Sequence, residues 1–335
     1  MKQVLKDTYC SPGTQEILSL NIESSDGGEI HTGSLVSSSG QYAIFDGIPV
    51  FIQTHNDYRP EVNQNRSYYN AVGKTYDEGM DWLFKSFYED EPVLRGKMLD
   101  LLELGPSGRV LEIGAGTCRD SVKLIQRLSK QGEAYISDLS LDMLVLGRER
   151  VAKAGLLSGQ DPQVEFLVCD AALLPFPDNF FDSVYHFGGL NLFGEKSKSF
   201  QEITRVVKVG GKVVIGDEGV PVWLRETRFG KVLINSNPLY RYEPPLQDLP
   251  IAAREVCVRW ILGGAFYVID YRVGEGEPPL DMDLPIPGKR GGTHRTRYDG
   301  SLEGVTPETK ARVLQAAADS GLSVHDWLEQ ALKKS

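Results

Sequence analysis

Residues 110–121 read VLEIGAGTCRDS, an apolar run that leads through the tight turn Gly114-Ala115-Gly116 into an amphipathic segment. A strand, a glycine turn and a helix in this order form a nucleotide site at the carboxyl end of a parallel strand. The glycines let the backbone approach a ligand closely, and the start of the following helix offers free N–H groups. This stretch therefore predicts a doubly wound α/β sheet with a ligand at the turn.

Glu112, two residues before Gly114, separates two classes of nucleotide ligand. An NAD-binding loop has a third glycine three residues after the second, and this chain has Arg119 there. A carboxylate at Glu112 is unfavourable beside a pyrophosphate but suits a cationic amino group. The combination indicates S-adenosylmethionine (SAM), an adenosine with an amino-acid tail and no phosphate. The alternative is an ordinary strand–helix turn without a ligand, which motifs farther along the chain disfavour.

Composition narrows the class of protein. The chain has 335 residues, enough for about two domains, and 41% of them are hydrophobic. Its formal net charge is −10, whereas nucleic-acid binders usually carry an excess of basic residues on one face. The four cysteines show no metal-ligand spacing, so we expect neither a disulfide framework nor a bound metal. We see no signal peptide and no apolar run long enough to span a bilayer, and we expect a cytoplasmic protein.

The pattern of the chain predicts four regions. They are a small β-rich domain (1–54), a polar linker with lid helices (55–105), the ligand-binding domain (106–273) and a C-terminal extension with two short helices (274–335). In the first region, apolar runs at 17–20 and 42–52 predict strands. Gly/Ser clusters at 24–28 and 33–40 predict the turns between strands.

The ligand-binding domain alternates strands and helices, which predicts a mostly parallel sheet covered on both faces. We expect strands at 109–113, 133–137, 164–169, 181–186 and 212–216, and helices at 120–131, 141–154 and 199–208. A double-glycine turn, Gly210-Gly211, precedes the fifth strand. Aromatic and β-branched runs at 256–263 and 266–273 then predict a hairpin. The fold class is thus a seven-stranded sheet that ends in an antiparallel hairpin.

Acidic residues follow the second and third predicted strands of this domain. Asp138 can accept hydrogen bonds from both ribose hydroxyls, and Leu139 can pack on the adenine. Asp170 can accept from the adenine amino group, and Ala171 offers a backbone N–H. Because the carboxyl ends of parallel strands share one edge of a sheet, these residues should lie near the glycine turn.

Together with LPFPDNFFD at 174–182 and EITRVVKVGG at 202–211, these motifs resemble those of class I SAM-dependent methyltransferases. Within that class the chain is similar to the group that includes the ubiquinone/menaquinone biosynthesis methyltransferases, over residues 109–273. The resemblance implies SAM as cofactor, with Glu112 and the backbone of Gly114, Ala115 and Gly116 at its methionine end, Asp138 on the ribose, and Asp170 with Ala171 on the adenine. Tyr76 matches a Tyr-Asp element that reaches the cofactor from the lid in such enzymes. Two departures stand out, since Cys118 replaces the last glycine of the first motif and Val209 the proline of the last.

The end of the first region, YAIFDGIPVFI at 42–52, resembles the closing strands of a small zinc-ribbon-like domain. That domain activates tRNA and ribosomal methyltransferases, and it also occurs fused in front of SAM-dependent methyltransferases. Of the two cysteine pairs in the family, only Cys10 remains here, with Gly13 where its partner would fall. We therefore expect the domain without its metal, and an unrelated β-hairpin appendage is the alternative.

The sequence gives weaker signals for the residues that would contact the methyl acceptor. Methyl transfer depends on alignment, and it needs a base only if the nucleophile must lose a proton. His186, at the end of the fourth strand, is our candidate for a general base or substrate-orienting group, and a structural histidine is an equal alternative. Asn191 is a second catalytic candidate. For binding of the acceptor we select Glu218 and three aromatic residues of the insertion 220–253, namely Trp223, Tyr240 and Tyr242.

We therefore expect transfer of a methyl group from SAM to an N, O or C atom of a small-molecule acceptor. One alternative is a tRNA or protein methyltransferase, suggested by the relatives of the zinc-ribbon-like domain. The other is a SAM-binding regulatory or scaffolding protein without catalysis, suggested by Cys118 and by the C-terminal helices. Those helices, which begin near Pro307 and Ser323, could also join two copies of the chain as a homodimer.

Overall fold

The computed structural model describes residues 8–52, 75–157, 162–288, 292–298 and 305–333, together with Met1, Ser67 and Leu302. The linker that we predict at 56–66 lies outside the described residues. The chain divides into two compact units, Met1–Pro278 and Pro279–Ser335.

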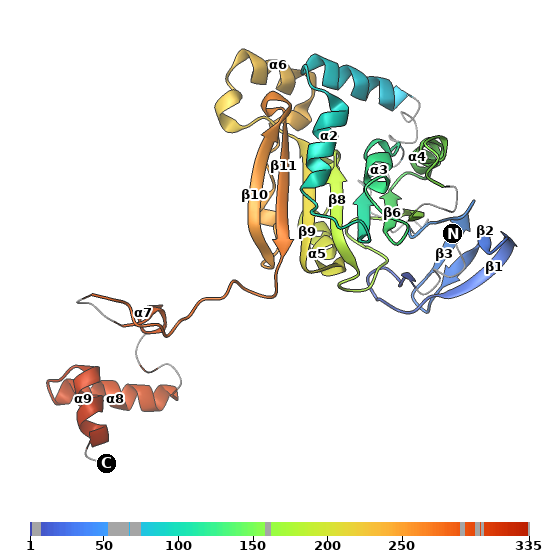
Figure 1. Ribbon diagram of the computed structural model, residues 1–335. Coiled ribbons are helices and arrows are strands. Elements are labelled where there is room, and N and C mark those ends of the chain that lie inside the picture. Colours follow the sequence, from blue (N-terminus) through green and yellow to red (C-terminus); the bar gives the residue numbers. More distant parts are fainter. Residues whose placement is uncertain are drawn as a thin grey trace. The chain divides into compact units, whose positions relative to one another are not determined.

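A seven-stranded sheet forms the centre of the first unit, with the strand order β10-β11-β9-β8-β5-β6-β7 (Figure 1). The parallel strands are β5 (Arg109–Ile113), β6 (Glu133–Asp138), β7 (Gln163–Val168), β8 (Phe181–Phe187) and β9 (Val207–Glu218). β10 (Ala253–Ile261) and β11 (Phe266–Val273) form the antiparallel hairpin, and β11 pairs with β9. The order reverses between β5 and β8, and open α/β sheets bind ligands at such a switch point.

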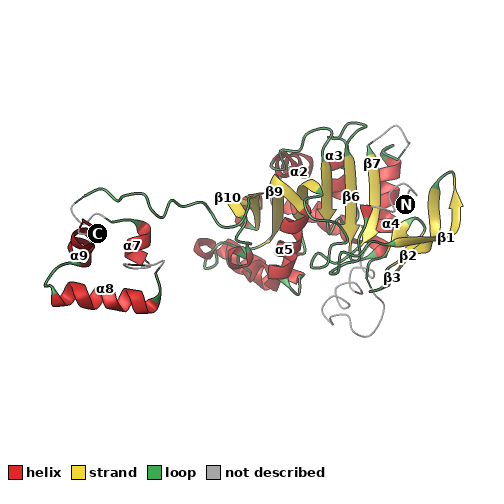
Figure 2. Cartoon of the chain, turned by 90° about the horizontal axis from the view of Figure 1, so that it is seen from below, coloured by secondary structure: helices red, strands yellow, loops and turns green. Residues whose placement is uncertain are grey.

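Helices cover both faces of the sheet (Figure 2). Successive strand side chains point to opposite faces, and in β5 they join two different cores. Val110 packs in one core with residues of α2 (Glu91–Asp100), α3 (Arg119–Ile125) and α4 (Leu141–Lys153). Its neighbour Leu111 packs in the other, with residues of α5 (Lys196–Val206). The predicted doubly wound architecture is confirmed.

A third core forms where the chain leaves the carboxyl end of β9. It joins the helical residues 75–86 to the insertion through Phe84, Val220, Tyr240 and Phe266. The insertion contains η3 (Val222–Leu224), α6 (Arg228–Ser236), η4 (Pro238–Arg241) and η5 (Leu246–Asp248), and η6 (Leu262–Gly264) connects β10 to β11. Helix 75–86 is therefore fixed beside the strand ends that form the switch point.

The N-terminal domain is a four-stranded antiparallel sheet that continues into the edge of the large one. Its strands are β1 (Ser19–Asp26), β2 (Glu29–Val36), β3 (Gln41–Phe45) and β4 (Ile48–Pro49). Directly after β4, Val50 pairs in parallel with Val168 of β7, and the Phe51 N–H donates to the Val168 carbonyl at 2.8 Å. The domain thereby covers the edge of β7.

Two sequence predictions about glycine are wrong in this domain and in β9. The cluster at 33–40 is not all turn, because Gly33 pairs within β2, where a Cβ would lie 2.3 Å from the Asn21 carbonyl oxygen of β1. Gly210-Gly211 is a bulge within β9, since Val207 pairs with Phe181 and Lys212 pairs with Ser183. In both places the glycine permits a close strand approach that a local turn signal cannot reveal.

The second unit contains α7 (His294–Tyr298), α8 (Pro307–Asp319) and α9 (Val324–Lys333). The two predicted helices are confirmed with their caps. Thr306 accepts from the Thr309 N–H at 3.3 Å, and Ser323 accepts from the Asp326 N–H at 3.0 Å. α7 is an additional helix in this extension, for which we predicted two. In the part of the chain that the structure describes, no helix combines the length and hydrophobicity needed to cross a bilayer.

Candidate active site

Two adjoining cavities lie at the carboxyl ends of the central strands. Cavity 1 has a volume of about 780 Å³ and cavity 2 of about 760 Å³. Both are lined by Tyr76 of helix 75–86, by Gly114 of the glycine turn and by Gly188, Gly189 and Leu192 after β8. The predicted glycine turn therefore lies at the boundary between the two cavities.

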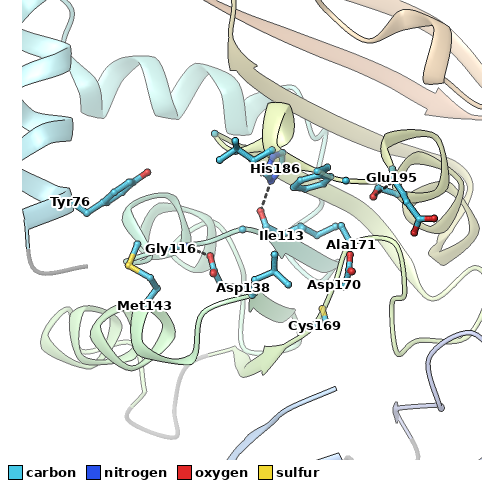
Figure 3. A pocket seen from close by; sticks show the side chains of 18 residues that line it. Tyr76, Ile113, Gly116, Asp138, Met143, Cys169, Asp170, Ala171, His186 and Glu195 are labelled. Carbon is cyan, nitrogen blue, oxygen red and sulfur yellow. Dashed lines mark hydrogen bonds between the residues drawn. The ribbon is translucent and has the colours of Figure 1, made fainter. Parts of the chain in front are cut away.

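Cavity 1 brings together most of the predicted cofactor residues (Figure 3). It is lined by Asp138 at the end of β6 and Leu139 after it, by Asp170 and Ala171 after β7, and by His186 of β8. These residues come from three strands that end at the same edge of the sheet. Their sequence positions alone predicted this arrangement.

The glycine turn holds Asp138 in place. Gly116, at a φ of +54°, directs its N–H to Oδ2 of Asp138 at 2.8 Å. The other oxygen of Asp138 accepts from the Ser140 N–H, also at 2.8 Å. Burial raises the pKa of Asp138, and these backbone donors act in the opposite direction. A Cβ on Gly114 would lie 3.1 Å from the His186 ring, so this position requires glycine.

Cavity 2 contains a buried carboxyl group with one unpaired oxygen. Glu112 is 3% exposed, and its Oε2 has no hydrogen-bond partner among the described residues. Burial and the nearby charge of Asp120 raise the pKa of Glu112 well above its usual value. An unpaired buried polar group is costly, and a cationic amino group would relieve that cost. The position of Glu112 in cavity 2 is therefore compatible with the amino-acid end of SAM.

Arg95 compensates part of the negative charge of Asp120 beside Glu112. Its guanidinium donates to Asp120 Oδ2 at 2.5 Å and to Glu91 Oε1 at 2.7 Å. The group is buried between the rings of Phe84 and Phe187, whose centroids lie 5.2 and 5.9 Å away. Sequence analysis missed the pairing of Arg95 with Asp120, because this contact joins two separate helices.

His186 has a defined tautomer. Its Nδ1 lies 2.8 Å from the Ile113 carbonyl oxygen, which can only accept, so the proton is on Nδ1. Nε2 then carries the lone pair, and it has no partner among the described residues. Burial lowers the pKa of His186 below its usual 6.5, so the ring is neutral at pH 7. A ring that is 1% exposed thus holds an available proton acceptor at the wall of cavity 1.

Four predicted acceptor-side residues lie outside the lining of both cavities. The Asn191 amide donates to the Glu218 carbonyl at 2.8 Å, and its oxygen accepts from the Tyr267 hydroxyl at 3.3 Å. Trp223 is 69% exposed, Tyr242 is exposed, and Tyr240 is buried against Phe266. Their positions in the chain did not determine the directions of their side chains. Glu218 does line cavity 2.

The comparisons with known proteins agree with this geometry. Residues 61–222 match the sequence model of the ubiE/COQ5 methyltransferase family. This part of the chain is therefore similar to the methyltransferases of that family. The predicted resemblance to the ubiquinone/menaquinone biosynthesis methyltransferases is confirmed.

Relatives of the methyltransferase domain include two named ubiquinone/menaquinone biosynthesis C-methyltransferases UbiE. The one from Stenotrophomonas maltophilia strain R551-3 is 31% identical over 166 residues, which are 44% of this chain and 64% of that protein. The one from Xanthomonas oryzae pv. oryzae is 37% identical over 110 residues, 33% of this chain and 42% of that protein. The chain thus spans less than two thirds of the length of these relatives.

Solved structures similar to the methyltransferase domain align at low identity. Haemonchus contortus phosphoethanolamine N-methyltransferase 2, in complex with SAM, is 16% identical with a TM-score of 0.44, covering 58% of this chain and 56% of that one. A SAM-dependent methyltransferase from Aquifex aeolicus is 21% identical with a TM-score of 0.40, covering 53% and 89%. The fold assignment rests on the strand order above rather than on these alignments.

Proposed function

We propose that this protein transfers the methyl group of SAM to a small-molecule acceptor, with carbon as the first candidate for the methylated atom. The observation that carries the proposal is the pair of adjoining cavities. One is lined by residues suited to a nucleoside, and the other contains an unpaired carboxyl and additional apolar space. The names of the relatives, C-methyltransferases of quinone biosynthesis, support carbon.

The cofactor's binding can be assigned to individual side chains. Bound SAM supplies a methyl group on a sulfonium, which a nucleophile takes by displacement of a neutral leaving group. Asp138 would hold the ribose hydroxyls, Asp170 with Ala171 the adenine, and Glu112 the amino group. Tyr76, which lines both cavities, would close the site from helix 75–86.

Methylation at carbon replaces a proton, which must leave the acceptor. His186 offers Nε2 for that proton, and its Nδ1–H stays bound to the Ile113 carbonyl. Because the ring is neutral at pH 7, it can act as a base without first losing a proton. His186 therefore remains our proposal for the general base.

The two alternatives receive less support. A scaffolding protein that only binds SAM needs no acceptor space, whereas cavity 2 extends past the glycine turn to Met80, Leu83 and Leu239. A tRNA methyltransferase would need a basic surface, and the chain carries a net charge of −10. The homodimer predicted from the C-terminal helices stays a prediction, which sedimentation of the full chain would test.

Titration calorimetry with SAM and S-adenosylhomocysteine tests the cofactor site. We expect Asp138→Ala to weaken binding of both by about 10- to 100-fold, because charge-assisted hydrogen bonds contribute about 1.5–3 kcal/mol. Asp142→Ala is the matched control, since Asp142 is exposed in the first turn of α4. Equal affinity of wild type and Asp138→Ala would reject this placement of the ribose.

A further inference from the structure

The chain that follows β8 forms a wall shared by the two cavities. Gly188, Gly189 and Leu192 line both of them, and residues 193–195 line cavity 1. Gly188 and Gly189 have φ values of +88° and +94°, a conformation that favours glycine. We call residues 188–193 the wall segment. Because this segment faces both cavities, its conformation affects the shape of each.

The short helix in the wall segment, η2 (Leu190–Leu192), receives its cap from another strand. Its N-cap residue is Gly189, which has no side chain to offer. The first N–H groups of a helix have no acceptor within the helix. Asp217 of β9 supplies one, since Oδ1 accepts from the Gly189 N–H at 3.1 Å and Oδ2 from the Asn191 N–H at 2.5 Å. Oδ1 also accepts from the Glu218 N–H at 2.8 Å, which fixes the side chain against its own strand.

Asp217 acts on the site without lining it. The residue is fully buried, and it belongs to the lining of neither cavity. Because a buried N–H group without an acceptor is costly, the two oxygens of Asp217 hold the wall segment at two points of its backbone. An amide could not replace the carboxyl group, since its NH₂ group would face one of the backbone donors.

The wall segment also reaches the histidine that we propose as the base. Phe193, its last residue, packs on the His186 ring with the two centroids 4.9 Å apart. The Phe193 N–H donates to the Leu190 carbonyl at 3.1 Å, so η2 connects this contact to the residues that Asp217 holds. The position of one buried carboxyl group is thereby transmitted to both cavities and to the surroundings of His186.

We propose that Asp217 is a positioning residue for methyl transfer, which holds the wall segment in the conformation that binds SAM and faces the acceptor. This role rests on the proposed function, and it belongs to a side chain that lines neither cavity. Opening of the wall segment is then coupled to release of the cofactor. Removal of the carboxyl group should weaken binding although no direct contact with the ligand is lost.

The first test needs no substitution. Amide hydrogen exchange of Gly189 and Asn191 is measured by NMR in the full chain, with and without S-adenosylhomocysteine. If the segment must be closed for binding, ligand at about 100 times its Kd should slow exchange of both amides by up to about 100-fold. Strand β1 lines neither cavity, so its amides are the internal reference and should keep their rates.

The second test compares two substitutions by titration calorimetry with S-adenosylhomocysteine. Asp217→Asn keeps the size of the side chain but turns one acceptor into a donor. We expect it to weaken binding by about tenfold or more, and to speed exchange of the Gly189 and Asn191 amides. Asp270→Asn is the matched control, because Asp270 is also buried, accepts from Lys212 at 2.7 Å and lines neither cavity. It should lower stability towards urea but leave affinity within about threefold of wild type.

Two results would overturn this role of Asp217. One is unchanged exchange of the Gly189 and Asn191 amides at saturation, which would mean that the wall segment opens without releasing the ligand. This result is obtained in wild type, so it decides the question even if Asp217→Asn fails to fold. The other is an affinity in Asp217→Asn that falls no further than in Asp270→Asn, which would make Asp217 a contributor to stability alone. Failure of wild type to bind S-adenosylhomocysteine would instead reject the proposed function as well.

Discussion

Cys118 shows how a departure from the glycine motif is accommodated. It lies in the left-handed region, at a φ of 60°, where L-residues other than glycine are strained by about 1–2 kcal/mol. Its side chain is fully buried, and burial raises the pKa of the thiol far above its usual value, which leaves it unreactive. The sulfur packs against Gly147 of α4, where a Cβ would lie 2.3 Å from Sγ. A second glycine thus makes room for the cysteine.

The contact between Cys118 and Gly147 predicts that a substitution that usually stabilises a helix will destabilise this protein. Gly→Ala inside a helix usually stabilises by about 1 kcal/mol, but Gly147→Ala should destabilise by about 1–3 kcal/mol through overpacking against Cys118. Adding Cys118→Gly should recover most of that loss. Urea unfolding of the four members of the double-mutant cycle measures the coupling free energy.

Gly96→Ala in α2 is the matched control for this cycle. A Cβ there would lie 3.6 Å from Arg127 Nη2, an ordinary contact, so the substitution should be neutral or stabilising. Additive effects of Cys118→Gly and Gly147→Ala would contradict the proposed compensation.

His186 gives the stability of the fold a specific pH dependence. Burial is the largest cause of its lowered pKa, so between the usual 6.5 and the lower folded value only the unfolded chain binds the proton. Stability from this group is therefore present above pH 6.5 and is lost as the pH falls through that window, by at most about 1.4 kcal/mol per pH unit.

Urea unfolding at about pH 7.5, 6.5 and 5.5 tests this sign. Wild type should lose more stability towards acid than His186→Gln, which cannot take up the proton. Parallel pH profiles for the two proteins would show that His186 titrates alike in the folded and unfolded states.

At the scale of elements, Asp77 fastens helix 75–86 to the glycine turn and to α4. Asp77 accepts from the Thr117 hydroxyl at 2.8 Å and from Arg119 at 3.1 Å, and it also pairs with Arg150 of α4. Burial would raise the pKa of Asp77, but these donors and charges lower it overall. Tyr76, the residue that precedes Asp77, lines both cavities. Asp77 thus positions the wall that covers the site.

Removing this charge should loosen the helix. We expect Asp77→Asn to speed amide hydrogen exchange in residues 75–86. It should weaken binding of S-adenosylhomocysteine by only about 3- to 10-fold, because Asp77 lines neither cavity and acts on the site through Tyr76. Glu78→Gln, an exposed neighbour, is the control. If exchange in Asp77→Asn stayed at the wild-type rate, the helix would be held by its other contacts, the apolar ones and the Asp81–Arg119 pair.

The elements themselves were largely predictable, because their signals are local. The glycine turn, the acidic residue after β6 and the caps of α8 and α9 all lie within short windows. Directions of side chains after a strand are not local. Asn191 bonds to Tyr267 of β11 and Tyr240 packs on Phe266, partners that the intervening insertion brings close. Arg95 and Asp77 escaped notice for the same reason.

At the scale of the whole first unit, the N-terminal domain and the large sheet share a core. Tyr9 and Phe51 lie 5.2 Å apart by ring centroid, and Tyr9 lies 5.5 Å from Phe176 of the loop before β8. The Cys10 N–H donates to the carbonyl of Pro175 in that loop at 3.1 Å. This loop follows Asp170 and Ala171 of cavity 1, so the N-terminal domain supports the segment that our proposal places at the adenine. Its relation to zinc-ribbon-like domains stays a prediction.

A shared core predicts that the two sheets unfold together. Phe51→Ala removes a buried ring that contacts Tyr9 and Tyr42, and it should cost about 3–5 kcal/mol. Phe45→Ala, at a ring that is 53% exposed, is the control and should cost far less. In calorimetry of the full chain, Phe51→Ala should shift the transition of the large sheet and not only that of the small one. Since S-adenosylhomocysteine is proposed to bind beside β7, it should raise the same transition in wild type. A low-temperature transition that Phe51→Ala shifts alone, while the ligand-sensitive transition keeps its midpoint, would mean that the two sheets unfold independently and that the N-terminal domain does not support the site.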